Sequence, residues 1–522
     1  MIPQSWQEFF TEQRRQMAEQ NLGRKLRILR HQAAGRVLLG SQELVNFSSN
    51  DYLGLSGDLR IAEAAARAAG RFGWGAGASR LVTGTSILHN ELEAAVSKFR
   101  GTDAALIFGS GYHANLAVIS ALVSGGDTVF SDSMNHASII AACRLSGADV
   151  RVYKHLGYEE LERQLSSSTV KGKRMIATDS LFSVEGDCVD CARILKLAER
   201  YDALIVLDDA HANGVLGKRG RGVSELQNVS GRMGVVTASF SKALGSFGGF
   251  VACSREVREY LINTSRPFIY TTAMPITLAA ANVEALRIVS TEGELLRQKL
   301  AGLVRTLRTK LQAAGFEVGG EHHILPLRVG DETRAMAYSE ALEQQGMLVH
   351  PMRFPTVQRG QALLRISVSA AHTDDDVYRL VNAFKVARDR TSGKGTGKVT
   401  RRENKRPDEA VEVTDDSTMT ALNFDEVQAL MAEAMSADPA SEKKTDKLRA
   451  PQDVSQVPQL LAEPGQETDT TKVSSETLHP ELEAEPSAPS QAVAAQQSLD
   501  DPSRSRKTQR LRKGQTRIHK KV

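Results

Sequence analysis

Between Phe47 and Ser254 the chain repeats a short apolar run, a polar or glycine-containing turn, and a segment with helical spacing of apolar residues. This repeat predicts an α/β fold with a mostly parallel sheet covered by helices. The clearest predicted strands are Ala104–Phe108, Thr128–Ser131, Met175–Thr178, Leu204–Leu207 and Val235–Ser239. Ligands of such sheets collect at the carboxyl ends of the strands. The residues that follow these five runs are therefore the first candidates for a functional site.

From about Pro275 the pattern changes to longer helical periodicity. It predicts a helix over Leu295–Ala314 and short strands over Ile324–Val329 and Leu363–Val368, which is typical of a smaller α+β domain. We expect four parts: an N-terminal helical arm with small strands (1–46), a large domain (47–285), a small C-terminal domain (286–390) and a tail (391–522).

The tail has a different composition from the rest of the chain. Its one aromatic residue is Phe424; residues 407–503 carry 21 acidic against 5 basic residues, and residues 504–522 carry nine basic residues and no acid. A segment so poor in apolar surface is expected to be disordered. The stretch Leu422–Met435 is amphipathic and is either a weakly helical tail segment or a segment that folds on a partner, whose identity is unknown.

Targeting and redox signals indicate a cytoplasmic protein. No run of about 18 apolar residues occurs, and Met1–Leu22 contains Gln, Glu and Arg where a signal peptide needs an apolar run. Four cysteines in 522 residues suit a reducing compartment. Cys188 and Cys191 form one CxxC pair, but no second CxxC or HxxxH follows, so we expect two small buried thiols and no metal site.

Lys242 follows the predicted strand Val235–Ser239 in a turn rich in small residues. Partial loss of hydration there lowers the pKa of a lysine and frees its amine to attack an aldehyde. The hydroxyls of Ser239 and Ser241 are placed to bond a phosphate. The alternative is an ordinary solvated lysine after a strand.

Asp208 ends the predicted strand Leu204–Leu207, and His211 follows three residues later. A carboxylate at that depth can pair with a protonated pyridine nitrogen and turn the ring into an electron sink, while His211 reaches the phenolic oxygen. A metal-binding pair or a plain loop start is the alternative. With Lys242, these residues indicate pyridoxal 5′-phosphate as the cofactor.

Three further turns follow predicted strands. Ser110, Gly111 and Tyr112 open a helix over His113–Leu122, whose free backbone N–H groups suit a phosphate. His136 is placed to stack on the cofactor ring and to act in proton transfer, and Ser183 to bond the ring oxygen. An ordinary strand-to-helix connection, a helix-cap histidine and a turn serine are the respective alternatives.

These residues lie in motifs that resemble the α-oxoamine synthases, from about Ser5 to Lys385. The motifs are SNDYLGL at 49–55, GASRLVTGTSILHNELE at 77–93, DDAH at 208–211, SFSKALG at 239–245 and IYTTAMP at 269–275. The resemblance implies a fold-type I, aminotransferase-like large domain with a seven-stranded sheet, pyridoxal phosphate on Lys242, and a homodimer. It also implies the catalytic group Lys242, Asp208, His211 and His136.

The resemblance implies further binding residues. Thr271 and Thr272 would reach the phosphate in the neighbouring subunit, and Arg365 would bind the amino-acid carboxylate. Asn50 and Thr356 are also expected at the substrate, together with His136. An acyl-chain carboxylate would meet Arg24, although Arg27 is almost as well placed.

Four stretches are most similar to the biotin-pathway members: 45–55, 329–334, 352–360 and 364–372. They imply an acyltransferase that condenses L-alanine with pimeloyl-CoA or a pimeloyl carrier protein, with loss of carbon dioxide. Two departures from these members are Ser239 in place of a threonine and Phe354 near the acyl site, which leaves the acyl chain open.

Two other readings stay open. One is a different α-oxoamine synthase, which joins glycine with acetyl-CoA or succinyl-CoA, or serine with a long acyl thioester, or makes a signal molecule. The other is a non-catalytic binding or scaffold protein that acts through the charged tail. The core has no expected nucleic-acid site, and a basic tail without interleaved aromatics is a weak signal for one.

Overall fold

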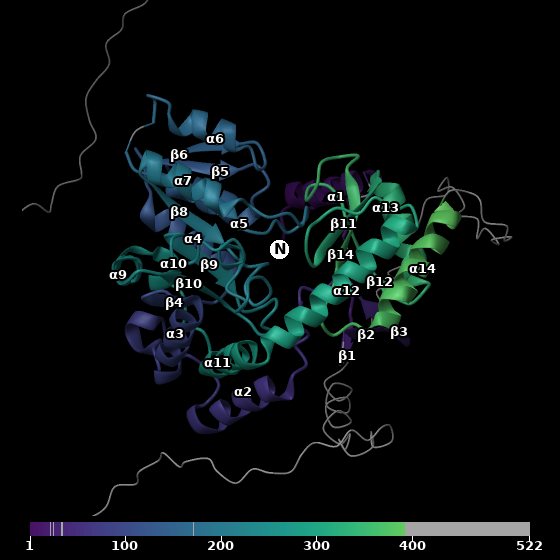
Figure 1. Ribbon diagram of the computed structural model, residues 1–522, viewed down its shortest axis with the longest axis horizontal. Helices are drawn as coiled ribbons and strands as arrows, with labels where there is room; N and C mark the ends of the chain where they lie inside the picture. Colours follow the sequence, from purple (N-terminus) through teal and green to yellow (C-terminus); the bar gives the residue numbers. More distant parts are fainter. Residues whose placement is uncertain (21, 25, 33–34, 171, 392–522) are drawn as a thin grey trace, which may run out of the picture. The chain divides into compact units, whose positions relative to one another are not determined.

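The computed structural model describes residues 1–20, 22–24, 26–32, 35–170 and 172–391 (Figure 1). The expectations for residues 392–522, including the stretch Leu422–Met435, lie outside the described residues.

The central element is a seven-stranded sheet, which confirms the predicted fold class. Its strands are β4 (Ala104–Phe108), β5 (Thr128–Asp132), β6 (Asp149–Tyr153), β7 (Arg174–Asp179), β8 (Ala203–Asp208), β9 (Val235–Ser239) and β10 (Gly249–Cys253). Their order is β4-β10-β9-β8-β7-β5-β6, and β10 runs antiparallel to both of its neighbours while the other pairs are parallel. The five strands predicted from the sequence all form.

Helices pack on both faces of this sheet (Figure 1). The helices of this part of the chain are α2 (Leu59–Phe72), α3 (Ile87–Arg100), α4 (Gly111–Leu122), α5 (Ala137–Ser146), α6 (Tyr158–Leu165), α7 (Cys191–Tyr201), α8 (Val223–Leu226), α9 (Arg255–Thr264), α10 (Arg266–Ile269) and α11 (Ile276–Thr291), with a π-helical turn η1 (Arg80–Gly84). Helix α2 packs on α11. Strand β4 is buried throughout because Ala105 and Ile107 face one apolar core while Leu106 and Phe108 face another. Burial on both sides explains why this strand is continuously apolar.

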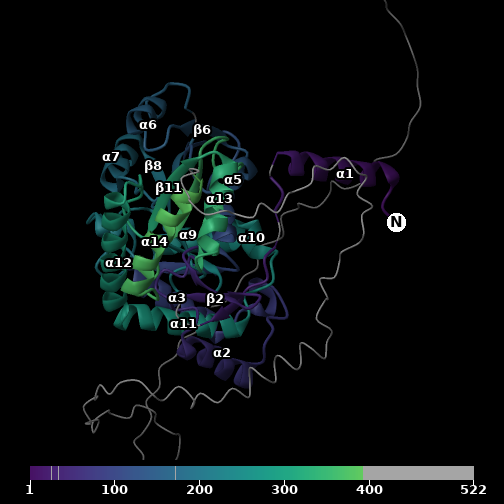
Figure 2. The same ribbon diagram turned by 90° about the vertical axis from the view of Figure 1, so that its right-hand side faces the viewer.

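The C-terminal part is α+β, as its periodicity predicts. It comprises α12 (Gly293–Ala313), β11 (Ile324–Gly330), α13 (Glu332–Glu343), β12 (Met347–Leu348), β13 (His350–Met352), β14 (Ala362–Ser367) and α14 (Asp374–Thr391). An antiparallel sheet of order β11-β14-β13 carries Arg365 on its central strand. Helices α12 and α14 lie side by side in both views (Figures 1 and 2).

The N-terminal elements are α1 (Gln4–Glu19), β1 (Arg30–Gln32), β2 (Arg36–Leu39) and β3 (Gln42–Asn46). The three strands form a four-stranded sheet with β12, so this N-terminal segment joins the C-terminal part through a parallel pairing of β3 with β12. No helix among the described residues is both long and apolar enough to span a bilayer.

Candidate active site

Polar side chains gather where the parallel strands end. Asp208 is the last residue of β8 and lies opposite Asp179, the last residue of β7, and opposite Thr237 of β9. Because the carboxyl ends of these strands lie at one edge of the sheet, the loops that follow them share one site.

A buried amide fixes the Asp208 carboxylate. Asn115 of α4 donates from Nδ2 to Asp208 Oδ2 at 2.6 Å, and the backbone N–H of Ala210 donates to Asp208 Oδ1 at 2.8 Å. Asn115 is itself held by Thr237, which donates to its Oδ1 at 2.7 Å, and it donates to Ser138 Oγ at 2.8 Å. Asp208 is therefore oriented before any ligand binds.

The next residue, Asp209, turns away to other partners. It forms a buried ion pair with Arg100 at 2.7 Å. The alternative of a metal-binding pair at 208 and 209 therefore finds no support, because Arg100 already neutralises Asp209.

Lys242 lies in the loop after β9. Burial lowers the pKa of its amine, while the charges of Asp208 and Asp179 raise it in part, so Lys242 and Asp208 are close enough to interact. Within the described residues the side-chain amine of Lys242 forms no hydrogen bond or ion pair, and only its backbone carbonyl accepts one, from Gly245 N at 2.9 Å. A lowered pKa and a free amine are the conditions for covalent attachment to an aldehyde.

Asp179 is a second buried carboxyl group beside Asp208. Its pKa lies well above the ordinary value because it is buried and because Asp208 is also negative. The Asp179 Oδ2 atom accepts from the backbone N–H of His136 at 2.6 Å, which holds the start of α5 against the site. A raised pKa favours the neutral form of Asp179.

Two imidazoles border the site. His136 caps α5 with its Nδ1 2.7 Å from Ser138 Oγ, and burial and the charge of Lys242 lower its pKa while Asp208 opposes them. The ring of Tyr112 lies 6.4 Å from that of His136, centroid to centroid.

His211 is buried. Burial, and then the positive charges of Lys242 and Arg365, lower the pKa of His211 well below the ordinary value. Both rings are thus held neutral near pH 7.

Arg365 approaches from the small sheet. Its Nη2 donates to Tyr52 Oη at 3.1 Å and to Asn50 Oδ1 at 3.1 Å, and its Nε donates to the Ser183 carbonyl oxygen at 2.5 Å. Tyr52 Oη also lies 2.6 Å from His211 Nδ1. One polar chain therefore joins Asn50, Ser183 and Arg365 to the imidazole beside Lys242.

The start of α4 forms a narrow cradle against β9 and β10. Ser110 caps the helix, and its Oγ accepts from His113 N at 3.1 Å. A Cβ atom on Gly111 would lie 3.3 Å from Ser239 Cβ, and one on Gly249 would clash with the backbone of Ser110 and Gly111. Ser239 Oγ and Ser241 Oγ lie 2.6 Å apart beside this cradle. Free N–H groups, two hydroxyls and space without side chains suit a phosphate.

These features fit pyridoxal phosphate. The cradle would hold the phosphate, Asp208 the ring nitrogen, Lys242 the aldehyde carbon, and His211 and Ser183 the phenolic oxygen. The structure thus brings together the expected residues Ser110, Gly111, Tyr112, His136, Ser183, Asp208, His211, Ser239 and Lys242, with Asn50 and Arg365 at the side of the small sheet.

The other expected residues have no described contact with this group. Thr272 pairs with Ser79 in an isolated β-bridge, and Thr271 precedes it. Arg24 and Arg27 both lie close enough to His350 to lower its pKa after burial and Arg353, and Arg27 pairs with Glu343 at 2.8 Å. Thr356 is exposed and donates its backbone N–H to Arg353 O at 2.9 Å.

Sequence reasoning missed Asn115, Asp179 and Tyr52. Asn115 is a buried polar residue within the apolar face of α4, which is the one signal that marks it. Asp179 ends a predicted strand, as Asp208 does, and Tyr52 lies inside the motif at 49–55. Each of the three side chains forms a hydrogen bond with a residue far away along the chain: Asn115 with Asp208, Asp179 with His136, and Tyr52 with His211.

Known proteins are similar to this chain in sequence. The family description "Aminotransferase class I and II" matches residues 42–384. The chain is 41% identical to the 8-amino-7-oxononanoate synthase of Thermoanaerobacter pseudethanolicus over 379 residues, which cover 72% of this chain and 96% of that protein. It is 43% identical to the enzyme of the same name from Geobacter sulfurreducens over 371 residues, 71% of this chain and 95% of that protein.

Solved structures agree in fold. A serine palmitoyltransferase from S. paucimobilis, which holds PLP and myriocin, superposes with a TM-score of 0.71 at 27% identity, covering 75% of this chain and 100% of that one. The 8-amino-7-oxononanoate synthase of Francisella tularensis superposes with a TM-score of 0.59 at 27% identity, covering 67% of this chain and 99% of that one.

Proposed function

The chain belongs to the aminotransferase class I and II family, and from this membership we propose that it condenses L-alanine with pimeloyl-CoA or a pimeloyl carrier protein. The products are 8-amino-7-oxononanoate, carbon dioxide and the free thiol, a step of biotin synthesis. The coarser activity, that of a pyridoxal-phosphate-dependent acyltransferase, follows from the relatives. The choice of L-alanine and a pimeloyl thioester as substrates is supported by the identity of 41–43% with two 8-amino-7-oxononanoate synthases over nearly their whole length.

The observation that carries the proposal is the meeting of four groups at one site. Lys242 and Asp208 interact at the carboxyl edge of the large sheet, and His211 is joined through Tyr52 to Arg365 of the small sheet. An amine, a carboxylate and an arginine are what a cofactor aldehyde, its ring nitrogen and a substrate carboxylate require.

When bound, pyridoxal phosphate withdraws electrons from the carbon next to the substrate nitrogen and makes its proton acidic. Asp208 would keep the ring nitrogen protonated, and Asn115 keeps Asp208 in position for this. The Lys242 amine, whose pKa burial lowers, would remove the proton from the amino-acid α-carbon and later return one.

Arg365 would hold the amino-acid carboxylate. Its guanidinium is fixed by Asn50, Tyr52 and Ser183, so little side-chain entropy is lost when a carboxylate binds. Attack of the α-carbon on the thioester carbonyl breaks the carbon–sulfur bond, and His136 would donate to the oxygen on which charge develops. The carboxylate then leaves as carbon dioxide.

Two arginines are candidates for the far carboxylate of the acyl chain. The charges of Arg24 and Arg27 both lower the pKa of His350, so both side chains lie near it. His350 of β13 is paired with Arg365 of β14. Arg27 is already paired with Glu343, whereas Arg24 forms no ion pair within the described residues. We therefore propose that Arg24 receives the pimeloyl carboxylate.

The same proposal includes a homodimer. Large apolar side chains remain exposed around the segment that pairs with Thr272, namely Phe72, Trp74, Leu81, Val82 and Ile87, with Tyr270 beside them. An exposed apolar patch next to two threonines that do not contact their own Lys242 site suits a second copy of the chain. Thr271 and Thr272 would then reach the phosphate in that copy.

A panel of substrates tests the assignment. The full-length holoenzyme is assayed for free-thiol release with L-alanine, glycine or L-serine, each with pimeloyl-, acetyl-, succinyl- or palmitoyl-CoA. We expect the highest kcat/KM for L-alanine with pimeloyl-CoA. A higher value for any other pair would assign the chain to a different α-oxoamine synthase.

Matched variants test the acyl site in the same assay. Arg24→Gln should raise KM for pimeloyl-CoA about tenfold or more, because a charged hydrogen bond of about 1.5–3 kcal/mol is lost. Arg27→Gln serves as the control and should leave KM near the wild-type value. The reverse order would transfer the role to Arg27.

A further inference from the structure

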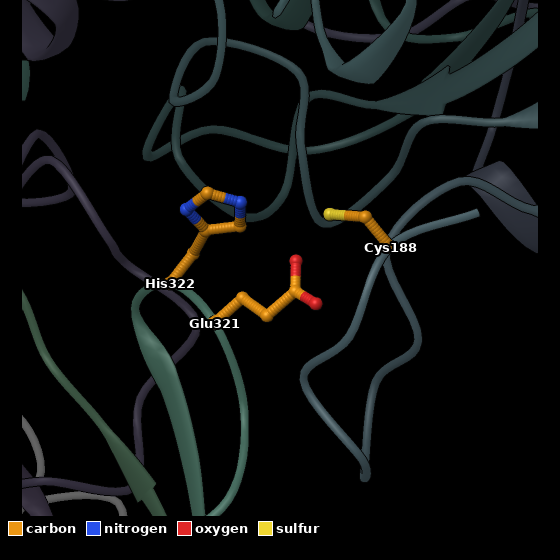
Figure 3. A group of neighbouring side chains, drawn as sticks. All are labelled: Cys188, Glu321 and His322. Atoms are coloured by element: carbon orange, nitrogen blue, oxygen red, sulfur yellow. The ribbon is translucent and has the colours of Figure 1, made fainter. Parts of the chain in front are cut away.

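Cys188 is only half-buried, contrary to the expectation of two buried thiols, and it forms a cluster with Glu321 and His322 outside the proposed active site (Figure 3). One ligand-type atom of each, the thiol sulfur, a carboxylate oxygen and a ring nitrogen, lies within 4.8 Å of the other two. Figure 3 shows the three side chains directed toward one common space. None of the three side chains forms a hydrogen bond or ion pair elsewhere in the described part of the chain.

Backbone contacts hold the two halves of the cluster together. Cys188 lies in the loop between β7 and α7, and Glu321 and His322 precede β11. The Glu321 N–H donates to the Gly186 carbonyl oxygen at 2.8 Å. Gly186 and Gly320 both have positive φ, at 69° and 74°, and a side chain on either would clash with Ile324 O. The close approach of these loops is therefore built into the fold.

The local charges favour a cation. Burial, and then the charges of Glu321, Asp187 and Asp209, raise the pKa of the Cys188 thiol. A bound cation reverses this penalty, because it replaces the thiol proton and neutralises the same negative field. Burial and Arg308 lower the pKa of His322, so its imidazole is neutral and carries a lone pair.

An entry route is present. A cavity of about 200 Å³ is lined by Glu321, His322 and His323 on one side and by residues of α12, including Val304 and Arg305, on the other. An ion can therefore reach two of the three side chains from solvent, which is a requirement for a site that fills after folding.

We propose that Cys188, Glu321 and His322 bind one Zn²⁺ ion, with water as the fourth ligand. A thiolate, an imidazole and a carboxylate are the ligand types of zinc, at about 2.3, 2.0–2.1 and 2.0–2.2 Å. In a tetrahedron of that size the ligand atoms lie about 3.3–3.8 Å apart. Small rotations of side chains that now lie within 4.8 Å of one another would complete the site.

The ion would tie the loop of Ser183 to the start of β11. That loop is already joined to the small sheet by the bond from Arg365 Nε to Ser183 O. Zinc would thus add a second link between the same two parts. The zinc proposal does not rest on the proposed reaction, because Cys188, Glu321 and His322 are not among the residues assigned to that reaction.

X-ray absorption at the zinc edge tests the site. Full-length untagged holoenzyme is reduced, treated with a chelator, dialysed and loaded with one equivalent of ZnCl₂. We expect one sulfur neighbour at about 2.3 Å and the remaining neighbours nitrogen or oxygen at about 2.0–2.2 Å. A zinc spectrum without sulfur would overturn the proposal.

The CxxC pair supplies a matched control. Cys188→Ser should remove the sulfur neighbour, whereas Cys191→Ser should keep it. His322→Gln should weaken zinc binding in equilibrium dialysis at least about tenfold, a loss that even an outer-shell change can cause. Near-ultraviolet circular dichroism checks that each variant is folded. Equal zinc binding by wild type, Cys188→Ser and His322→Gln would contradict the assignment.

Discussion

The position of Asp208 can be predicted from the sequence, whereas the orientation of its side chain cannot. Its place at the end of an apolar strand is visible in the sequence, but its orientation depends on Asn115, which lies on α4, far away along the chain. The sequence pattern therefore predicts which residues reach the site, since each directly follows a strand. It cannot predict Asn115, Asp179 or Tyr52 as their partners, because those contacts form only when separate elements pack.

His155 is a residue whose charge depends on two such partners. Burial alone would lower its pKa, but hydrogen bonds with Asp132 and Asp187, at 3.0 and 3.1 Å, outweigh burial and raise the pKa to about 10. Asp187 lies in the loop that also carries Ser183 and Cys188. The protonated imidazole therefore links the end of β5 to that loop.

This linkage predicts a pH-dependent stability. Because the folded-state pKa is raised, the stabilisation by His155 is full below its unfolded pKa of about 6.5 and is lost as pH rises through about 10. His155→Gln should lower the free energy of unfolding by about 1.5–3 kcal/mol near pH 6, the value of a charged hydrogen bond, and by less as pH approaches 10. Urea unfolding at both pH values measures the difference.

The exposed residue His31 provides the control. His31→Gln should change the free energy of unfolding little at either pH. If the deficit of His155→Gln were the same near pH 6 and near pH 10, the two ion pairs would not depend on a protonated imidazole.

At the scale of elements, buried strands were easier to predict than partly exposed ones. Strand β4 is apolar at all five positions, whereas β6 reads DVRVY with only Tyr153 buried, and it was not among the predicted strands. Strand β10 is apolar and buried, but it runs antiparallel after a turn and does not follow the strand–helix repeat. The periodicity of the sequence therefore predicts the five strands that end at the site, but not β6 and β10.

The start of α4 leads to a prediction about an element. Gly111→Ala would place a methyl group 3.3 Å from Ser239 Cβ, inside the proposed phosphate cradle. We expect the affinity of the apoenzyme for pyridoxal phosphate to fall about tenfold, which corresponds to an overpacking cost of about 1–3 kcal/mol. Titration of the apoenzyme, followed by cofactor absorbance, measures this affinity.

Gly125→Ala is the matched control, because its methyl group would meet no atom closer than Gly147 O at 3.9 Å. It should bind the cofactor as the wild type does. If both variants bound equally tightly, the phosphate would not lie against Gly111.

At the scale of the whole molecule, the predicted fold class is confirmed: an α/β large domain with a mostly parallel seven-stranded sheet and a smaller α+β part. The repeat of strand and helix predicted the α/β class and the mostly parallel sheet, and the family resemblance implied the seven strands. The proposed division at residues 46, 285 and 390 is less simple, because β3 pairs with β12 and so joins the N-terminal segment to the small domain. Such pairing over a long sequence distance leaves no mark in local periodicity.

The proposed homodimer gives a prediction at this scale. Val82 is 73% exposed in the apolar patch near Thr272. Val82→Asp should raise the dimer dissociation constant about 30-fold or more, because a charge would be buried without a partner, and should weaken cofactor binding in parallel. Sedimentation velocity over a range of concentrations measures the dissociation.

Val152→Asp, at a side chain that is 56% exposed on β6, is the control and should leave the dimer intact. A wild-type chain that sediments as a monomer, or a Val82→Asp variant as dimeric as wild type, would contradict the shared site.

The proposed function depends above all on Lys242, which would carry the cofactor within reach of Asp208. Its most direct test is borohydride reduction of the full-length holoenzyme, which fixes the cofactor to its lysine, followed by peptide mapping by mass spectrometry. We expect a single pyridoxyl group on the peptide that contains Lys242, and none on the same peptide of Lys242→Ala. A group on any other lysine in the wild type, or no group at all, would contradict it.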